Sequence, residues 1–158
     1  MKYLKKIPLL FFLILTISCG FQPILKDLDL SRISFKQINY TGDQRLIFLA
    51  KSNLNLNLRK NNSTNGYILD LSFSESKSTS SLDSAGNPNK EQLTVNIGMI
   101  LKDNNNKIIT QDRFEGSRTI NVTSSLSADD QRLTLERLNI ANEIFPRILF
   151  SINLAFKE

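Results

Sequence analysis

The apolar patterns along the chain predict an α+β fold of two layers, in which two helices pack on one face of a four-stranded, mostly antiparallel sheet. Two observations predict it. Four segments alternate apolar and polar residues with the period of two that marks a half-buried strand, and two others repeat apolar residues with the period of a helix. Their order is β-α-β-β-β-α, which leaves the other sheet face polar. The 158 residues suffice for one domain.

The first strand and helix are predicted over residues 32–40 and 44–60. In the strand, Ile33, Phe35 and Gln37 share one parity. Residues 41–43 form a turn, in which Asp43 or Thr41 is placed to cap the helix. The helical stripe consists of Leu46, Leu49, Ala50, Leu54 and Leu58. The alternation at the end of this stripe competes as a strand signal, but the upstream spacing favours a helix.

Three further strands are predicted over residues 67–74, 93–102 and 107–120. The polar segment 76–91 is interpreted as a long mobile connection or as the flared end of a hairpin. The residues Asp103-Asn104-Asn105-Asn106 tolerate positive φ angles, so a tight turn is expected between the last two strands.

The fourth strand has a poor alternation, because Asp112 and Arg118 share the parity of Phe114. Either a bulge near Gly116 shifts the phase, or the end of the strand leaves the core.

A C-terminal helix is predicted after Ser127, with Ser127 as the N-cap and Asp129 and Asp130 in the first turn. Its apolar stripe consists of Leu135, Leu138, Ala141, Phe145, Ile148, Leu149, Ile152 and Phe156. Pro146 removes a backbone hydrogen bond, and a kink is expected there because the stripe continues in register beyond it.

Residues 1–18 are predicted to be an export signal. Lys2, Lys5 and Lys6 precede an apolar run over 7–17, which at about 11 residues is too short to span a bilayer. The alternative is an uncleaved membrane helix or a buried core helix. The charged flank and the small residue before Cys19 agree better with export.

The segment Leu15-Thr16-Ile17-Ser18-Cys19 resembles a bacterial lipobox, with Thr16 departing from the usual leucine. This resemblance implies a diacylglycerol and an N-acyl chain on Cys19, the only covalent group expected, with no cofactor or metal. Gly20 stands where an aspartate would favour the inner membrane, so the outer membrane, at its periplasmic face, is the expected location. Residues 19–31 are then a lipidated tether and residues 32–158 the domain.

Composition excludes many kinds of site. The chain has no histidine, and Cys19 is its single cysteine, so disulfides, histidine triads and ordinary zinc sites are not expected. The net charge of +5 includes three leader lysines; without them 17 basic and 15 acidic residues remain, which removes the argument for a nucleic-acid partner. Asp112 with Glu115, and Asp129 with Asp130, are pairs of carboxylates, but no nucleophile accompanies them, so an enzyme is not expected.

The element order and the stretch VNIGMILKDNNNKIITQDRF, together with Cys19-Gly20-Phe21 and a following proline, resemble the LptE-like lipopolysaccharide-assembly lipoproteins. In the turn of that stretch, Asn105 or Asn106 stands where the family often has glycine. The resemblance covers essentially the whole mature chain.

The resemblance implies a non-enzymatic protein that plugs and helps to assemble the β-barrel translocon LptD and contacts lipopolysaccharide. Candidate contacts to lipid phosphates are the cations of the last three strands, Lys90, Lys102, Lys107, Arg113 and Arg118. Basic residues at strand ends more commonly protect sheet edges against aggregation. The alternative function is an adaptor subunit of another envelope complex, without affinity for lipopolysaccharide.

Overall fold

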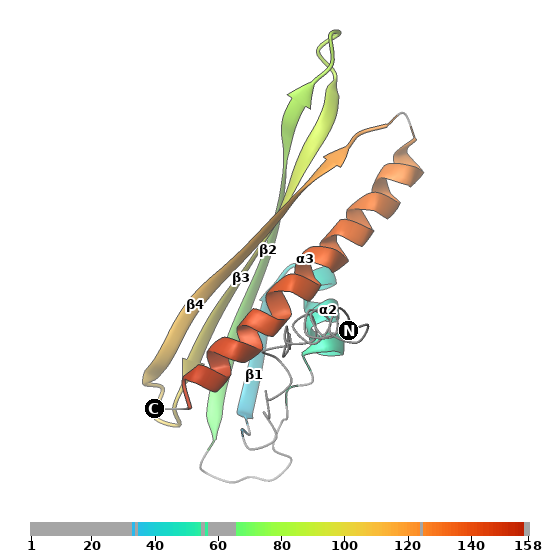
Figure 1. The fold of residues 1–158 in the computed structure, drawn as a ribbon. Coiled ribbons are helices and arrows are strands. Elements are labelled where there is room, and N and C mark those ends of the chain that lie inside the picture. Colours follow the sequence, from blue (N-terminus) through green and yellow to red (C-terminus); the bar gives the residue numbers. More distant parts are fainter. Residues whose placement is uncertain (1–32, 34, 55, 57–65, 124, 157–158) are drawn as a thin grey trace, which may run out of the picture.

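The protein folds as one four-stranded sheet with both helices on the same face (Figure 1). The computed structural model describes residues 33, 35–54, 56, 66–123 and 125–156. The elements are β1 (Phe35–Gly42), α2 (Gln44–Asn53), β2 (Tyr67–Leu82), β3 (Pro88–Lys102), β4 (Ile108–Asn121) and α3 (Leu126–Leu154). β1 pairs with β2 in parallel, and the other pairs are antiparallel. The predicted fold class and element order are confirmed, whereas the leader and the Cys19 tether lie outside the described residues.

A bulge in β1 changes which parity faces the helices. The register against β2 shifts between Phe35 and Gln37. Phe35 is fully buried before the bulge, whereas after it Tyr40 lies on the helix side and stacks on Phe73. The simple alternation predicted for this strand is therefore wrong beyond Phe35, and Gln37 points to the other face, where its amide donates to Asn39.

The turn between β1 and α2 requires a glycine and a capping acid. Gly42 has a φ of +105°, and a Cβ there would lie 1.9 Å from the Phe73 carbonyl oxygen. The Asp43 carboxylate accepts the backbone N–H groups of Arg45 and Leu46, which confirms Asp43 as the N-cap.

Helix α2 ends earlier than predicted, at Asn53 instead of residue 60. Ser52 and Asn53 each donate a side-chain hydrogen bond to the carbonyl four residues back. Such side chains compete with the backbone for helical hydrogen bonds, and the asparagine-rich continuation has low helix propensity. Most of residues 55–65 lie outside the described chain.

The polar segment 76–91 is not a long connection. β2 and β3 continue through it, paired as far as Leu82 and Pro88, so the hairpin interpretation is confirmed.

The β2–β3 turn and the β3–β4 turn are built alike. The Asp83 carboxylate accepts two backbone N–H groups and Gly86 has a φ of +85°, while Asp103 accepts two in the same way and Asn106 has a φ of +62°.

Beyond residue 108, the side chains of β4 alternate between the two sheet faces without interruption. Both explanations offered for its poor apolar–polar alternation, a bulge near Gly116 and a strand end that leaves the core, are therefore wrong. No register shift occurs near Gly116; the shift lies between Leu101 and Lys102 of β3. Gly116 instead lets α3 approach, because a Cβ there would lie 2.5 Å from the Ile140 Cγ2 atom. The polar residues of this parity face α3, where Asp112 accepts a hydrogen bond from Ser151.

α3 begins two residues before the predicted start and continues through Pro146 without a break. Ser125, not Ser127, is the N-cap and accepts the Ala128 N–H. The largest fully buried side chains come from both helices and from the covered face of the sheet: Phe35, Leu46, Leu54, Leu69, Leu71, Leu93, Ile97, Met99, Leu101, Ile140, Ile144 and Ile148.

Candidate docking face

The sheet face opposite the helices, called here the uncovered face, is polar as predicted. The pairing registers place its residues in rows across the four strands. One row is Thr41, Ser72, Gly98 and Arg113, and the next is Asn39, Asp70, Ile100 and Gln111. Ser74, Asn96 and Glu115 continue the pattern toward the hairpin end.

An open groove of about 1390 Å³ runs over the centre of the uncovered face and around the β1 edge. Its floor is low because Gly98 has no side chain and Ser72 beside it has a short one; a Cβ on Gly98 would lie 2.5 Å from the Ser72 hydroxyl oxygen. Between Glu91 and Lys102, β3 carries no charged residue. The β3 part of the groove floor therefore carries no ion, and the charged groups that the uncovered face places in the groove, Asp70 and Arg113, come from the neighbouring strands β2 and β4.

Asp70 anchors a hydrogen-bonded chain across three strands of the uncovered face. Its carboxylate accepts a hydrogen bond from Lys102 Nζ at 2.5 Å and another from Asn39 Nδ2 at 2.6 Å. The Lys102 ammonium, and after it the Asn39 amide, hold the pKa of Asp70 below its ordinary value, against the opposing effect of partial burial. Lys102, a predicted lipid contact, is thus already paired with an acid.

Arg113 is the candidate cation nearest the centre of the uncovered face. It is exposed, and its guanidinium donates to the Asn96 side-chain oxygen at 3.2 Å. No described carboxylate lies within ion-pair distance of it. Its charge therefore remains available to a ligand.

The remaining three candidate cations lie elsewhere. Arg118 faces α3 and forms ion pairs with Glu143 and, at 3.9 Å, Glu136. Lys90 lies near the β2–β3 turn and Lys107 in the β3–β4 turn, both exposed. Lys90 and Lys102 are twelve residues apart on β3, or roughly 40 Å at the rise of a strand. The five predicted residues therefore do not converge on one site.

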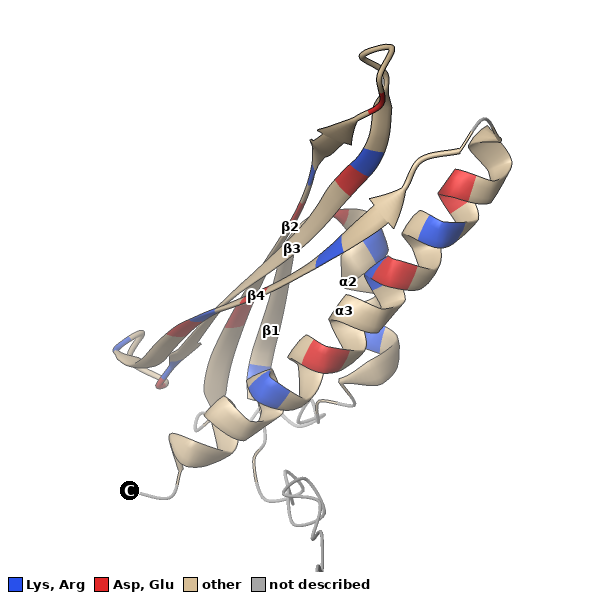
Figure 2. Ribbon diagram, turned by 45° about the horizontal axis from the view of Figure 1, so that its top comes forward, with Lys and Arg blue, Asp and Glu red and all other residues tan. Residues whose placement is uncertain are grey.

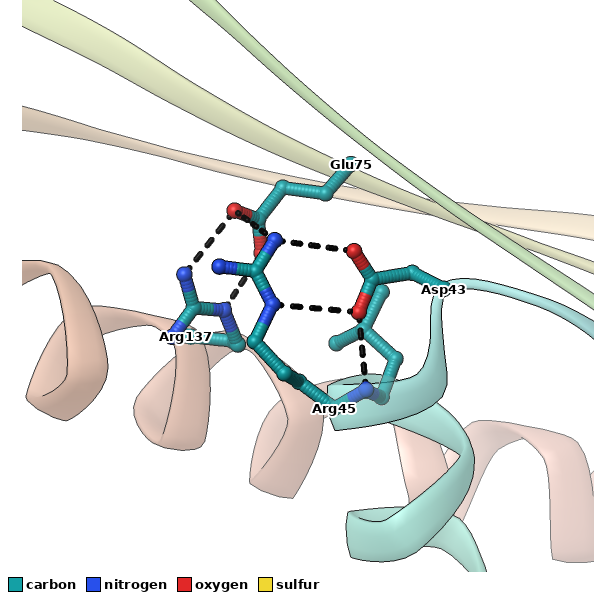
Figure 3. Close-up of polar contacts among 5 residues, drawn as sticks. Asp43, Arg45, Glu75 and Arg137 are labelled. Atoms are coloured by element: carbon teal, nitrogen blue, oxygen red, sulfur yellow. Dashed lines mark hydrogen bonds and ion pairs between the residues drawn. The ribbon is translucent and has the colours of Figure 1, made fainter.

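The covered face holds an ionic network that the sequence reasoning missed (Figure 3). Glu75 of β2 accepts hydrogen bonds from Arg137 of α3 at 2.5 and 2.9 Å, and Arg45 of α2 lies 3.4 Å from the same carboxylate. Arg137 is 6% exposed. The network joins the sheet to both helices. Arg45 also binds Asp43 and, with the backbone N–H groups of the helix start, lowers the pKa of that carboxyl.

The carboxylate pairs noted in the sequence are not arranged for acid–base chemistry. Asp112 faces α3 while Glu115 lies on the uncovered face. Asp129 accepts hydrogen bonds from the backbone N–H and hydroxyl of Thr123, which lower its pKa, and so closes the loop before α3. In the described ranges no three potential metal ligands gather, and no helix is long and apolar enough to cross a membrane.

Helix α3 carries charges of both signs along its length. Acidic and basic residues alternate along α3 in Figure 2, from Asp129 and Arg132 to Glu143 and Arg147. Arg147 reaches back to β4, where it lies over the Phe114 ring and donates to the Glu115 carbonyl. These contacts tie α3 to the β4 edge.

The residues that shape the uncovered face had a signal in the sequence. Ser72, Asn96 and Gln111 occupy the polar parity of strands that were predicted correctly, but the pairing registers that bring them together were not predictable. Glu75 also had a signal, because it shares the parity of the buried Leu71 and Phe73. An acid on an apolar parity indicates a buried partner.

Comparison with known proteins finds the fold among lipoproteins. No family model matches the chain, and no curated protein is similar in sequence. The chain is similar in structure to rare lipoprotein B from Shewanella oneidensis, with a TM-score of 0.58, 19% identity, and coverage of 74% of this chain and 93% of that one.

Two further structures agree. A minor lipoprotein from Acinetobacter baumannii has a TM-score of 0.55 at 12% identity, covering 76% of this chain and 92% of its own. Lipoprotein B from Nitrosomonas europaea gives 0.55 at 12% identity, covering 79% and 89%. These lipoproteins have the LptE-like fold, so the fold that the sequence resemblance implied is the one observed.

Proposed function

We propose that the chain is a non-enzymatic, lipid-anchored lipoprotein of the outer membrane. It is held at the periplasmic face by acyl chains on Cys19, and it plugs and helps to assemble the LptD β-barrel during lipopolysaccharide transport. The uncovered face carries this proposal. A barrel lumen presents alternate polar side chains to its interior, and a rigid sheet face of hydroxyl and amide groups is complementary to such a wall.

Three features support the proposal. The lipobox-like segment before Cys19 supplies a membrane anchor. The backing of the uncovered face is stiff, because both helices and the Glu75–Arg137 pair hold the sheet. The three solved proteins described above are named as lipoproteins, and none of those three names describes an enzyme.

Among the candidate lipopolysaccharide contacts, Arg113 is the best placed. It lies on the uncovered face with an amide partner, and no described carboxylate neutralises it. A guanidinium that is not committed to a carboxylate can bind a phosphate in bidentate fashion. Lys102 and Arg118 are already paired with acids, and Lys90 and Lys107 lie at opposite ends of β3.

The test for the partner is site-specific photocrosslinking of the full-length protein in its own cells. A photoreactive residue at Gln111, on the uncovered face, is expected to crosslink to LptD. The matched control is Gln131, an exposed glutamine on α3. Failure to recover LptD from a saturating pull-down would contradict the proposal. Recovery of a different envelope protein would instead identify an adaptor of another complex.

The lipid contact is tested separately. Arg113→Gln is expected to reduce the lipopolysaccharide co-purified with the protein several-fold while leaving recovery of LptD unchanged. Arg132→Gln serves as control, because Arg132 is a half-exposed α3 cation that binds the Asn121 carbonyl. Equal losses from both variants would mean that lipopolysaccharide binding does not depend on Arg113.

A further inference from the structure

One end of the domain carries half of the large exposed apolar side chains. Of the eight that the described chain contains, Ile108 and Ile109 follow the β3–β4 turn, and Phe150 and Leu154 lie in the last turns of α3. Ser151 donates a hydrogen bond to Asp112 of β4, which fixes the end of α3 beside the start of β4. Figure 1 shows this turn and the C-terminus at the same end of the molecule. These four residues are called here the apolar end.

The chain from Cys19 enters the domain at the apolar end. Ile33 is buried, and β1 begins at Phe35, which pairs with Tyr67. Tyr67 in turn packs edge-on against Phe156, just beyond the end of α3. Thirteen residues separate Cys19 from Ile33, and this segment spans at most about 50 Å even when fully extended.

The opposite end of the domain lies much farther from the anchor point. β3 runs from Lys102 at the apolar end to Pro88 at the far hairpin turn, a distance of roughly 46 Å at the rise of a strand. Acyl chains on Cys19 would therefore bring the apolar end to the bilayer easily. They would bring the far turn there only if the tether were close to its full extension.

The chemistry of the apolar end fits a phospholipid surface. Two lysines accompany the apolar side chains: Lys36, whose ammonium donates to the Asn104 side chain, and Lys107, which is exposed in the turn. The only acid of that turn, Asp103, is occupied by the backbone N–H groups of Asn105 and Lys107. Apolar side chains beside lysines are typical of surfaces that settle into the headgroup region of anionic membranes.

We propose that the apolar end docks on the phospholipid surface in which the Cys19 acyl chains are inserted, so that the domain stands with the β2–β3 hairpin directed away from the membrane. This inference rests on the acylation of Cys19 in the proposed function, and it describes the anchored protein when it is free of the barrel, which is the state that the test below reconstitutes. The surface that the apolar end contacts is the bilayer itself.

The test uses depth-dependent fluorescence quenching. Because Cys19 is the single cysteine and is blocked when acylated, a cysteine introduced elsewhere is the only free thiol. Ile108→Cys and Leu154→Cys report on the apolar end, and Leu82→Cys on the far hairpin is the matched control. Their native residues are 51%, 50% and 56% exposed. Each mature, acylated variant is labelled with an environment-sensitive fluorophore and reconstituted into phosphatidylethanolamine–phosphatidylglycerol vesicles.

Brominated lipids are expected to quench the label at residues 108 and 154 at least twofold more than the label at residue 82. Equal quenching at all three positions, stronger quenching at 82, or quenching at none of them in acylated, vesicle-bound protein overturns the docking proposal alone. Self-association that shields residues 108 and 154 from the bromine also overturns it, because the occupant is then a second copy. An unmodified Cys19 in the mass spectrum overturns the proposed function, and the docking proposal with it.

Discussion

Removing the charge of Glu75 tests how the two layers are held together. Glu75→Gln keeps the size of the side chain but leaves the Arg137 guanidinium, whose side chain is 8% exposed, without its carboxylate. Breaking a buried pair by removing one partner costs about 3–5 kcal/mol of unfolding free energy. For a small domain with a total stability of about 5–15 kcal/mol this is a large fraction. In urea denaturation followed by circular dichroism, the midpoint should fall by roughly 2 M.

Two comparisons make this prediction specific. Glu91→Gln is the same substitution on β3, where Glu91 forms a 2.9 Å pair with the half-exposed Lys77; it should cost less than about 1 kcal/mol. Replacing Glu75 and Arg137 together by methionine should cost less than Glu75→Gln alone, because no uncompensated charge is then buried. If Glu75→Gln and Glu91→Gln destabilise equally, the Glu75–Arg137 pair is not desolvated and the reasoning is refuted.

Two further predictions concern the sheet. Gly116→Ala should lower the free energy of unfolding by about 1–3 kcal/mol, because the new Cβ meets the buried Ile140 side chain, and the loss should be smaller in an Ile140→Ala background. Gly98→Ala is the control: its Cβ would also lie 2.5 Å from a neighbour, but that neighbour is the movable Ser72 hydroxyl, so urea denaturation should show a nearly neutral effect. Equal effects of the two substitutions would contradict the close approach of α3. The pKa of Asp70 is lower in the folded protein, so its contribution to stability is present above the unfolded pKa of about 3.9 and is lost as the pH falls through the folded pKa. The Asp70→Asn variant should therefore lose less stability than the unmodified protein between about pH 5 and 3. Identical pH profiles of stability for the two proteins would refute this.

Sequence patterns predicted the elements well where one face is apolar and the other polar. The centres of β2 and β3 were located correctly, because Leu69, Leu71 and Phe73 face the same core as Val95 and Ile97. The outer half of the β2–β3 hairpin was not predicted definitely as strand, because few apolar residues there alternate with polar ones. Its turn had a local signal nevertheless: Asp83 and Gly86 have the spacing of Asp103 and Asn106 in the turn that was predicted.

The candidate site was less predictable, because it depends on registers and on helix packing. The sequence shows that Arg118 shares the parity of the apolar residue Phe114, but it does not show why. The explanation is that Arg118 pairs with Glu143 and Glu136 of α3, which follows later in the chain. The sequence identified Arg113 only as a basic residue of a strand. It is the best placed candidate contact because it lies on the opposite face of the sheet from those acids. A single sequence does not indicate which side chains of neighbouring strands lie opposite one another.

The distribution of charge between the two faces bears on what the uncovered face can do. Ionic residues on the sheet's covered parity, such as Glu75 and Arg118, are paired with helix residues. On the uncovered face, β3 instead carries no charge between Glu91 and Lys102. Hydroxyls and amides such as those of Ser72 and Asn96 are transferred from water to an interface less unfavourably than unpaired charges, when new hydrogen bonds replace the old. A face meant only for solvent gains nothing from lacking charges, since charged residues on open sheets protect against aggregation. The uncharged run of β3 over residues 92–101 therefore supports the proposed polar partner surface over permanent exposure to water.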